Sequence, residues 1–324
     1  MLSAFIAQPQ GLARFELRAG AEIPGEAIWL DLLEPTPSEE KQVESFLSID
    51  VPTRDEMREI EASNRLYEED GALYMTATVV TKLDSDLPES TQITFILSAA
   101  KLVTNRYVDP LPFRRFIAYA ERHPGSCNTP PAVLAGLLEA VINRVADVIE
   151  RVATDLDGAS VEVFSASRRQ RGAFRDFRKT LERLGQNGEL ISKARESLVS
   201  LGRLLTFAQQ STSVPMSTEV RARLRTLTRD VMAMSDHASF LGTKVSFILD
   251  ATLGLINIDQ NNILKIFSVV TVFLLPPSVI GAIFGMNFSK MPWLHEEWGF
   301  WAAMGVMLVS AIGPFVYFKQ KGWL

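Results

Sequence analysis

The chain has 324 residues, and its 33 lysines and arginines stand against 38 aspartates and glutamates, which gives a net charge of −5. A hydrophobic fraction of 47% excludes an intrinsically disordered chain, the negative charge argues against a nucleic-acid partner, and the single Cys127 excludes an intramolecular disulfide. The mean hydropathy of +0.10 is unusual for a chain with 22% charged residues, so the apolar residues must be concentrated in one part of the sequence.

Residues 1 to about 108 alternate short β-like runs with polar helical segments, which is typical of an α+β fold. Helices are predicted over 37–48 and 53–63, the second with Thr53 as its N-cap. Neither a glycine-rich dinucleotide fingerprint nor a Walker lysine occurs in this half, so a nucleotide-binding fold has no support. Six runs rich in β-branched and aromatic residues are predicted strands: 5–8, 13–17, 27–32, 72–80, 91–97 and 101–107.

From Pro131 onward, apolar residues recur three and four positions apart, which predicts long helices. Breaks are expected at 185–188, which contains two glycines, and at 213–215, which ends in a proline. From 217 to 284 the pattern predicts one near-continuous helix, roughly 90 to 100 Å long, which needs packing partners along its length. The positions expected to pack in a bundle are Leu224, Leu227, Val231, Met234, Ala238, Leu241, Val245 and Ile248.

Two C-terminal segments, 266–284 and 298–318, contain no charged residue. A bilayer core about 30 Å thick needs roughly 20 apolar residues in a helix, so both segments are long enough to span it. The alternative, two buried helices of a soluble core, is less favoured because such helices seldom run this far without a charge. The predicted domains are a cytoplasmic α/β domain with a helical second half (1–216), a stalk (217–262), spans at 263–284 and 298–318, a connection (285–297) and a basic tail (319–324).

The orientation in the membrane follows from the start of the chain and from the charges that flank the spans. The N-terminus does not read as a signal peptide, so the first 262 residues are expected in the cytoplasm. Lys265, Lys319 and Lys321 lie at the ends that would face inward, whereas the connection carries Lys290 against Glu296 and Glu297. By the positive-inside rule, both chain ends are cytoplasmic and the connection faces outward.

Sequence signatures of common enzymes are missing. The three histidines, His123, His237 and His295, are scattered, and none has cysteines or carboxylates at the spacing of metal ligands. No nucleophile elbow of the G-x-S-x-G type occurs. The sequence therefore predicts a protein that is not an enzyme.

Small and hydroxyl-bearing residues recur at helical spacing along the first span. Such a stripe either lines a polar conduit or allows close helix packing, and both interpretations stay open at this point. Two spans cannot enclose a conduit, so a pore would require a ring of protomers that each contribute the first span. The stripe consists of Asn261, Leu264, Ser268, Thr271, Leu275, Ser278, Ala282 and Gly285.

The absence of carboxylates in both spans constrains the ion that such a pore would pass. A hard cation that sheds water reluctantly, such as Mg²⁺, can pass partly hydrated where hydroxyls, amides and carbonyls bind its waters. Leu264 and Leu275 would form apolar rings that block conduction by dewetting when the ring narrows.

Several motifs occur together in the C-terminal half. Gly285-Met286-Asn287 directly follows the first span, Phe288 and Met291-Pro292 come next, and the chain closes with a basic tail. These motifs resemble those of the CorA family of magnesium channels. The order of long helix, first span, G-M-N, short loop, second span and basic tail matches as well. The run AIWLDL at 27–32 is also similar to the proteobacterial branch of the family.

The resemblance implies a homopentamer in the bacterial inner membrane that conducts Mg²⁺, and also Co²⁺ or Ni²⁺, inward. It places Gly285, Met286 and Asn287 in a ring at the outer mouth, with the Asn287 amide oxygen accepting from metal-bound water. It assigns Asp250 to the cytoplasmic neck and implies inhibition by cytoplasmic Mg²⁺ bound between protomers, for which the candidates are Asp84, Asp86 and Asp230. The pore-facing positions implied are Asn261, Leu264, Ser268, Thr271, Leu275 and Ser278.

The outer connection departs from the family pattern. Phe284 and Ser289 stand where many relatives have tyrosine and glutamate, and Lys290 and Trp293 occur where acidic residues are common. Fewer acidic groups would weaken the concentration of cations at the mouth. Two alternatives remain: a proton-coupled zinc transporter of the same superfamily, which Met286 disfavours, and a membrane-anchored sensor or scaffold for divalent ions.

Overall fold

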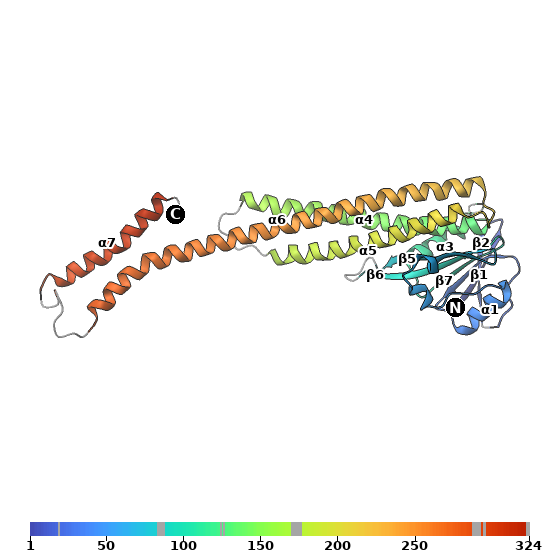
Figure 1. Cartoon of the computed structure of the whole chain (residues 1–324), viewed down its shortest axis with the longest axis horizontal. Helices are drawn as coiled ribbons and strands as arrows, with labels where there is room; N and C mark the ends of the chain where they lie inside the picture. Colours follow the sequence, from blue (N-terminus) through green and yellow to red (C-terminus); the bar gives the residue numbers. More distant parts are fainter. Residues whose placement is uncertain are drawn as a thin grey trace. The chain divides into compact units, whose positions relative to one another are not determined.

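The computed structural model describes residues 1–18, 20–82, 88–123, 125, 127–169, 177–286, 293 and 296–321 (Figure 1). The chain divides into two compact units, Met1–Leu249 and Asp250–Leu324. One helix, α6 (Thr218–Phe284), belongs to both units and confirms the near-continuous helix predicted from 217 to 284.

The N-terminal part of the first unit contains a mixed sheet in the order β2-β1-β3-β7-β6-β5-β4. All neighbouring strands are antiparallel except β3 and β7, which pair in parallel with Asp31 opposite Thr104. The six predicted strands are confirmed, and β4, which the sequence pattern did not predict, adds one edge. The strands are β1 (Leu2–Gln8), β2 (Gly11–Leu17), β3 (Ala27–Leu33), β4 (Leu66–Glu69), β5 (Ala72–Thr81), β6 (Glu89–Leu97) and β7 (Leu102–Arg106).

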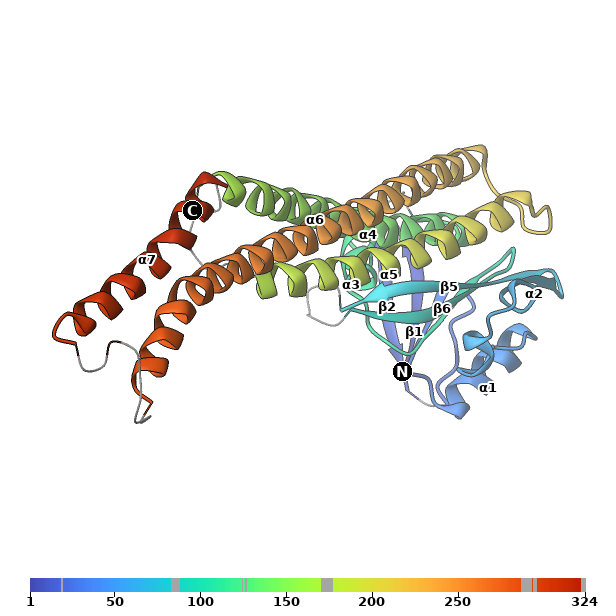
Figure 2. The ribbon, with the colours of Figure 1, turned by 60° about the vertical axis from the view of Figure 1, so that its left-hand side comes forward.

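Both faces of this sheet are covered. Helix α1 (Pro37–Leu47) packs on one face through Val43, and α3 (Leu111–Ala120), α4 (Pro130–Arg169) and α5 (Phe177–Gln210) cover the other (Figure 2). On the second face Trp29 contacts Phe116 of α3, with ring centroids 6.0 Å apart. All residues of β5 and β7 are buried, including the polar Thr104, Asn105 and Arg106 at the end of β7.

The helix predicted over 53–63 is wrong, although α1 is confirmed with a capping box at Thr36. The segment forms only a 3₁₀ turn, η1 (Glu56–Arg58), and the four-residue α2 (Ala62–Arg65). Thr53 is not its N-cap, which is Asp55, but Thr53 and Glu56 exchange hydrogen bonds: the Glu56 N–H donates to Thr53 Oγ1 at 3.4 Å and the Thr53 N–H donates to Glu56 Oε2 at 2.8 Å. The turn stops because Glu59 leaves the helical conformation and its carbonyl accepts from the Arg65 guanidinium. A side-chain contact from six residues further along the chain therefore takes this carbonyl.

The break predicted at 185–188 is also wrong, since α5 continues through both glycines. Asn187 is buried and donates to Asp155 Oδ2 of α4 at 2.6 Å, and a Cβ atom at Gly188 would lie 3.5 Å from Val245 of α6. Packing on both neighbouring helices offsets the roughly 1 kcal/mol that a helical glycine costs. The break predicted at 213–215 is confirmed, because α5 ends at Gln210 and α6 begins at Thr218.

The first part of α6 packs with α4 and α5 through the predicted apolar positions. Arg223 forms an ion pair with Glu139 of α4, and Lys244 forms one with Asp157. Met234 and Val245 are half-buried. The remaining predicted positions are at most 5% exposed: Leu224, Leu227, Val231, Ala238, Leu241 and Ile248.

The second unit contains the C-terminal part of α6 and helix α7 (Gly299–Gln320). Both predicted spans are therefore helices. Pro276 and Pro277 lie inside α6 and Pro314 lies inside α7 without ending either helix.

Candidate ion-conduction site

Two helices of the described chain, α6 and α7, are long and apolar enough to cross a membrane. In the most apolar 18-residue stretch of α6, no part is buried by the rest of the protein. In the corresponding stretch of α7, only 11% is buried. A helix of a soluble core would be covered by its neighbours, so the apolar surface of these two helices is suited to lipid or to further copies of the chain.

Helix α7 packs on one side of α6. A Cβ atom at Gly281 would lie 3.5 Å from Met307 Cε, and Gly281 thus leaves room for α7. A mostly apolar hollow of about 290 Å³ lies between the two helices, and its lining residues define the α7-facing side of α6. These residues are Val269, Val270, Phe273 and Leu274 from α6 and Pro314, Phe315 and Phe318 from α7.

The predicted stripe lies on average on the opposite side of α6, because at 100° per residue its mean direction is turned by roughly 150° from the mean direction of the α7-facing residues. Asn261, Ser268, Thr271 and Ser278 are exposed, and Leu264 and Leu275 are 63% and 58% exposed. The structure therefore brings the six predicted pore-facing residues onto one uncovered face.

The hydroxyl groups of this face already donate hydrogen bonds to the backbone of their own helix. Ser268, Thr271 and Ser278 each donate to the carbonyl four residues earlier at 2.8 Å. Each hydroxyl oxygen keeps lone pairs that can accept a hydrogen bond. The face thus offers oxygen acceptors, which suits a cation that arrives with bound water, because metal-bound water donates.

The predicted outer-mouth residues are described only in part. Gly285 closes α6 by donating to the Gly281 carbonyl at 3.0 Å, and Met286 is 49% exposed. Asn287 lies outside the described residues. Beside this end of α6, Trp293 stacks on Phe284 with ring centroids 6.4 Å apart and lies 5.8 Å from Trp298. Aromatic rings of this kind are typical of the membrane–water interface.

Two of the four predicted cytoplasmic carboxylates lie in the part of the chain that the structure describes. Asp230 and Asp250 are both exposed on α6, and Asp84 and Asp86 lie outside the described residues. Across the described ranges, no group of three or more His, Cys, Asp or Glu side chains could hold a metal ion. A site between protomers would need only one or two carboxylates from each copy, so Asp230 fits that role by exposure alone.

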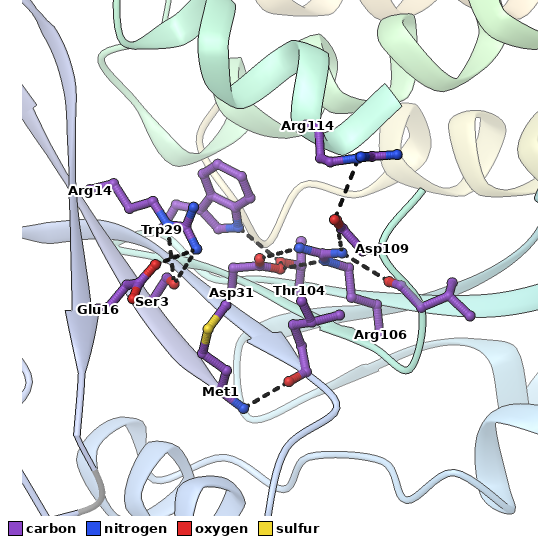
Figure 3. Close-up of polar contacts among 12 residues, drawn as sticks. Met1, Ser3, Arg14, Glu16, Trp29, Asp31, Thr104, Arg106, Asp109 and Arg114 are labelled. Atoms are coloured by element: carbon purple, nitrogen blue, oxygen red, sulfur yellow. Dashed lines mark hydrogen bonds and ion pairs between the residues drawn. The ribbon is translucent and has the colours of Figure 1, made fainter. Parts of the chain in front are cut away.

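The sequence analysis missed a buried polar network in the sheet (Figure 3). Arg106 Nε and Nη2 donate to the two Asp31 carboxylate oxygens at 3.0 and 2.8 Å, and both side chains are at most 3% exposed. Thr104 Oγ1 donates to Asp31 at 2.6 Å and accepts from Trp29 Nε1 at 2.9 Å. The available signal was Asp31 inside the apolar run at 27–32, and only the parallel register of β3 and β7 brings Arg106 to it.

Arg106 also positions Asp109 at the surface. Its Nη1 donates to Asp109 Oδ1 at 2.8 Å. Burial by itself lowers the pKa of Arg106, but the hydrogen bonds and charges of Asp31 and Asp109 outweigh it and raise that pKa. Asp109 lines a cavity of about 720 Å³ with Glu34, and the same cavity is lined by three cationic side chains, Lys82, Arg114 and Arg144. This excess of positive charge disfavours a cation site there.

Together, a soluble α/β domain, a helix that continues from it into an apolar pair of helices, and an acceptor-bearing uncovered face define a two-span membrane protein. The family described as CorA-like Mg2+ transporter protein matches residues 24–320, and the chain belongs to this family.

Known proteins resemble the chain over its whole length. It is 33% identical to a magnesium transport protein CorA of Pasteurella multocida (strain Pm70) and 31% identical to one of Escherichia coli (strain K12), with 100% of both chains covered in each case. The complete structure of the CorA magnesium transporter from Methanocaldococcus jannaschii matches with a TM-score of 0.77 at 18% identity, covering 100% of this chain and 99% of that one. The fold is therefore that of the family from end to end.

Proposed function

We propose that this chain is a channel that conducts Mg²⁺, and also Co²⁺ or Ni²⁺, into the cell without a chemical step. The names of its relatives and its family support Mg²⁺ as the transported ion. The observation that carries the proposal is the acceptor-bearing face of α6, which lies opposite α7 and is left uncovered.

An uncovered face of this kind needs other copies of the chain. One copy cannot enclose a conduit, whereas a ring of copies turns each α6 stripe inward and each α7 outward toward lipid. Five copies are proposed from the resemblance. The membrane is the bacterial inner membrane, with both termini in the cytoplasm.

Mg²⁺ gives up its water reluctantly and prefers octahedral coordination by oxygen, so it passes most easily with part of its hydration shell. In this proposal the hydroxyl oxygens of Ser268, Thr271 and Ser278 accept from those waters, and the Asn287 amide oxygen does the same at the outer mouth. The Leu264 and Leu275 side chains form two apolar rings that close the conduit by dewetting.

Regulation is proposed at the interface between protomers in the cytoplasm. Carboxylates of neighbouring copies repel one another until a divalent ion bridges them, so Mg²⁺ bound there stabilises the closed ring. The candidates are Asp84, Asp86 and Asp230, with Asp250 at the cytoplasmic neck.

The test is uptake into proteoliposomes loaded with a Mg²⁺-sensitive dye, with the wild type beside Asn287→Ala and a matched control, Asn262→Ala. Asn262 precedes the span and lies off the stripe at helical spacing. The wild type and the control should take up Mg²⁺ rapidly, millimolar internal Mg²⁺ should suppress the flux, and Asn287→Ala should lose at least about 90% of it while assembling normally.

Two outcomes would overturn the proposal. Entry of Zn²⁺ together with protons, without entry of Mg²⁺, would identify a zinc transporter of the superfamily. If no divalent ion enters proteoliposomes that contain the correctly assembled wild type, the spans would be identified as the anchor of a sensor or scaffold.

A further inference from the structure

A second candidate site lies in the first unit, far along the chain from the stripe. A pocket of about 370 Å³ opens between α2, the edge of β5 and one face of α5. Its size is within the range of roughly 300 to 1,000 Å³ that is typical of small-molecule sites. Figure 2 shows α2, β5 and α5 in this region of the molecule.

The pocket exists because the edge strand is short. β4 pairs only with Ala72–Met75, so β5 has no strand neighbour on that side from Thr76 onward. The backbone N–H of Thr78, which a longer β4 could have paired, donates instead to Ser200 Oγ of α5 at 2.9 Å. Arg65 Nη1 donates to Thr78 Oγ1 at 3.0 Å. Side chains thus replace the missing strand and leave a hollow between them.

The pocket has a strong excess of positive charge. Three arginines, Arg65, Arg195 and Arg203, line it against the single carboxylate of Glu196. In the part of the chain that the structure describes, neither Arg195 nor Arg203 has an ion-pair partner within 4.0 Å. Burial lowers the pKa of Arg65; the charge of Glu196 opposes this effect, and the smaller effect of the Arg203 charge adds to it.

Hydroxyl donors accompany these charges. Ser192 and Ser200 both line the pocket from α5. The oxygen of Ser200 accepts from Thr78, so its own hydrogen can turn toward a ligand. Guanidinium groups present planar pairs of N–H donors that match the oxygens of a phosphate group and bind it more strongly than neutral donors do.

We propose that this pocket binds a phosphate group through Arg65, Arg195 and Arg203, either as free phosphate or as the phosphate of a nucleotide. A phosphate group carries a charge of about −1.5 to −2 at neutral pH, which matches the excess of two positive charges in the pocket. An uncharged or cationic ligand would leave the arginines facing one another. The site lies wholly within the first unit and does not depend on the transport proposal.

The test is calorimetric titration of the full detergent-solubilised chain in magnesium-free buffer, with inorganic phosphate in one arm and ADP in the other. The test variant is Arg195→Gln combined with Arg203→Gln. The matched control is Arg178→Gln, an 84% exposed arginine on the same helix that pairs with Glu182 outside the pocket. All three proteins are first compared by circular dichroism, and retained helicity is expected because the replaced side chains are exposed.

Saturable binding to the wild type and the control, at least about ten-fold weaker in the double variant, would support the site. Tighter binding of ADP than of phosphate would identify a nucleotide as the source, and equal binding would identify the phosphate group alone. Failure of both probes to saturate the wild type at about 10 mM, or equal affinity in the double variant, would overturn the proposal.

Discussion

At the scale of single residues, the Asp31–Arg106 pair buries two opposite charges in the α/β domain. Both side chains are nearly removed from water, so hydrogen bonds within the protein must replace the hydration that each loses. Thr104 and Asp109 supply the remaining hydrogen bonds. The pair gives little net stability by itself, but removal of one partner leaves a buried charge without compensation.

We therefore expect Arg106→Met to destabilise the domain by about 3 to 5 kcal/mol. Removal of both charges in Asp31→Leu combined with Arg106→Met should recover much of that loss, since no uncompensated charge remains. Thermal unfolding of the solubilised chain, followed by near-ultraviolet circular dichroism, measures both effects.

The control is Arg114→Gln, because Arg114 is 62% exposed and its contact with Asp109 is long, at 3.5 Å. That substitution should shift the unfolding temperature very little. An Arg106→Met protein as stable as this control would contradict a structural role for the buried pair.

At the scale of elements, the glycines of the long helices differ in whether packing requires them. A Cβ atom at Gly136 of α4 would overlap the ring of Phe116, which is 5% exposed and contacts Trp29. A Cβ atom at Gly185 of α5 would meet no other atom within 4 Å. Only the first glycine is required by packing.

The same substitution should thus have opposite effects at the two positions. Gly136→Ala should destabilise the α3–α4 contact by about 1 to 3 kcal/mol, because Phe116 must shift within a packed core. Gly185→Ala should stabilise α5 by up to about 1 kcal/mol, because alanine is the better helix former. A rise in the unfolding temperature of Gly136→Ala would contradict the packing of α3 on α4, and a fall for Gly185→Ala would contradict the open surroundings of Gly185.

At the scale of the whole molecule, the two parts of helix α6 have different surroundings. Six of the predicted apolar positions of α6 up to Ile248 are buried against α4 and α5, whereas Leu264 and Leu275 further along are largely exposed. The spacing of apolar residues is helical throughout, and what changes is the residue type on the remaining surface. Charged residues occur on that surface up to Lys265, and none occurs from Ile266 to Phe284.

The proposed apolar ring at Leu275 makes a prediction for the assembly. Leu275→Ser should keep Mg²⁺ uptake several-fold above the wild-type level when internal Mg²⁺ is millimolar, because a polar ring stays wet in the closed state. The control is Leu308→Ser on α7, an equally drastic change at a residue that is 62% exposed. Dye-loaded proteoliposomes measure both, and equal fluxes in the two variants would remove Leu275 from the gate.

Local patterns in the sequence determined the strands, the long helices and the two spans. Alternation, three-and-four spacing and charge-free length are properties that depend on a few neighbouring residues. The stripe of α6 was predictable for the same reason, since helical spacing alone puts its members on one face. The G-M-N motif and its context were enough to identify the family.

Only the tertiary structure decided where contacts override local preference. The predicted helix over 53–63 stops early because Arg65 takes the Glu59 carbonyl, and α5 passes through its glycines because Asn187 is held by Asp155. The Asp31–Arg106 pair joins residues more than 70 positions apart. The pocket of three arginines joins residues more than 120 positions apart. Such pairs depend on strand register and helix docking, which the residues near each partner in sequence do not specify.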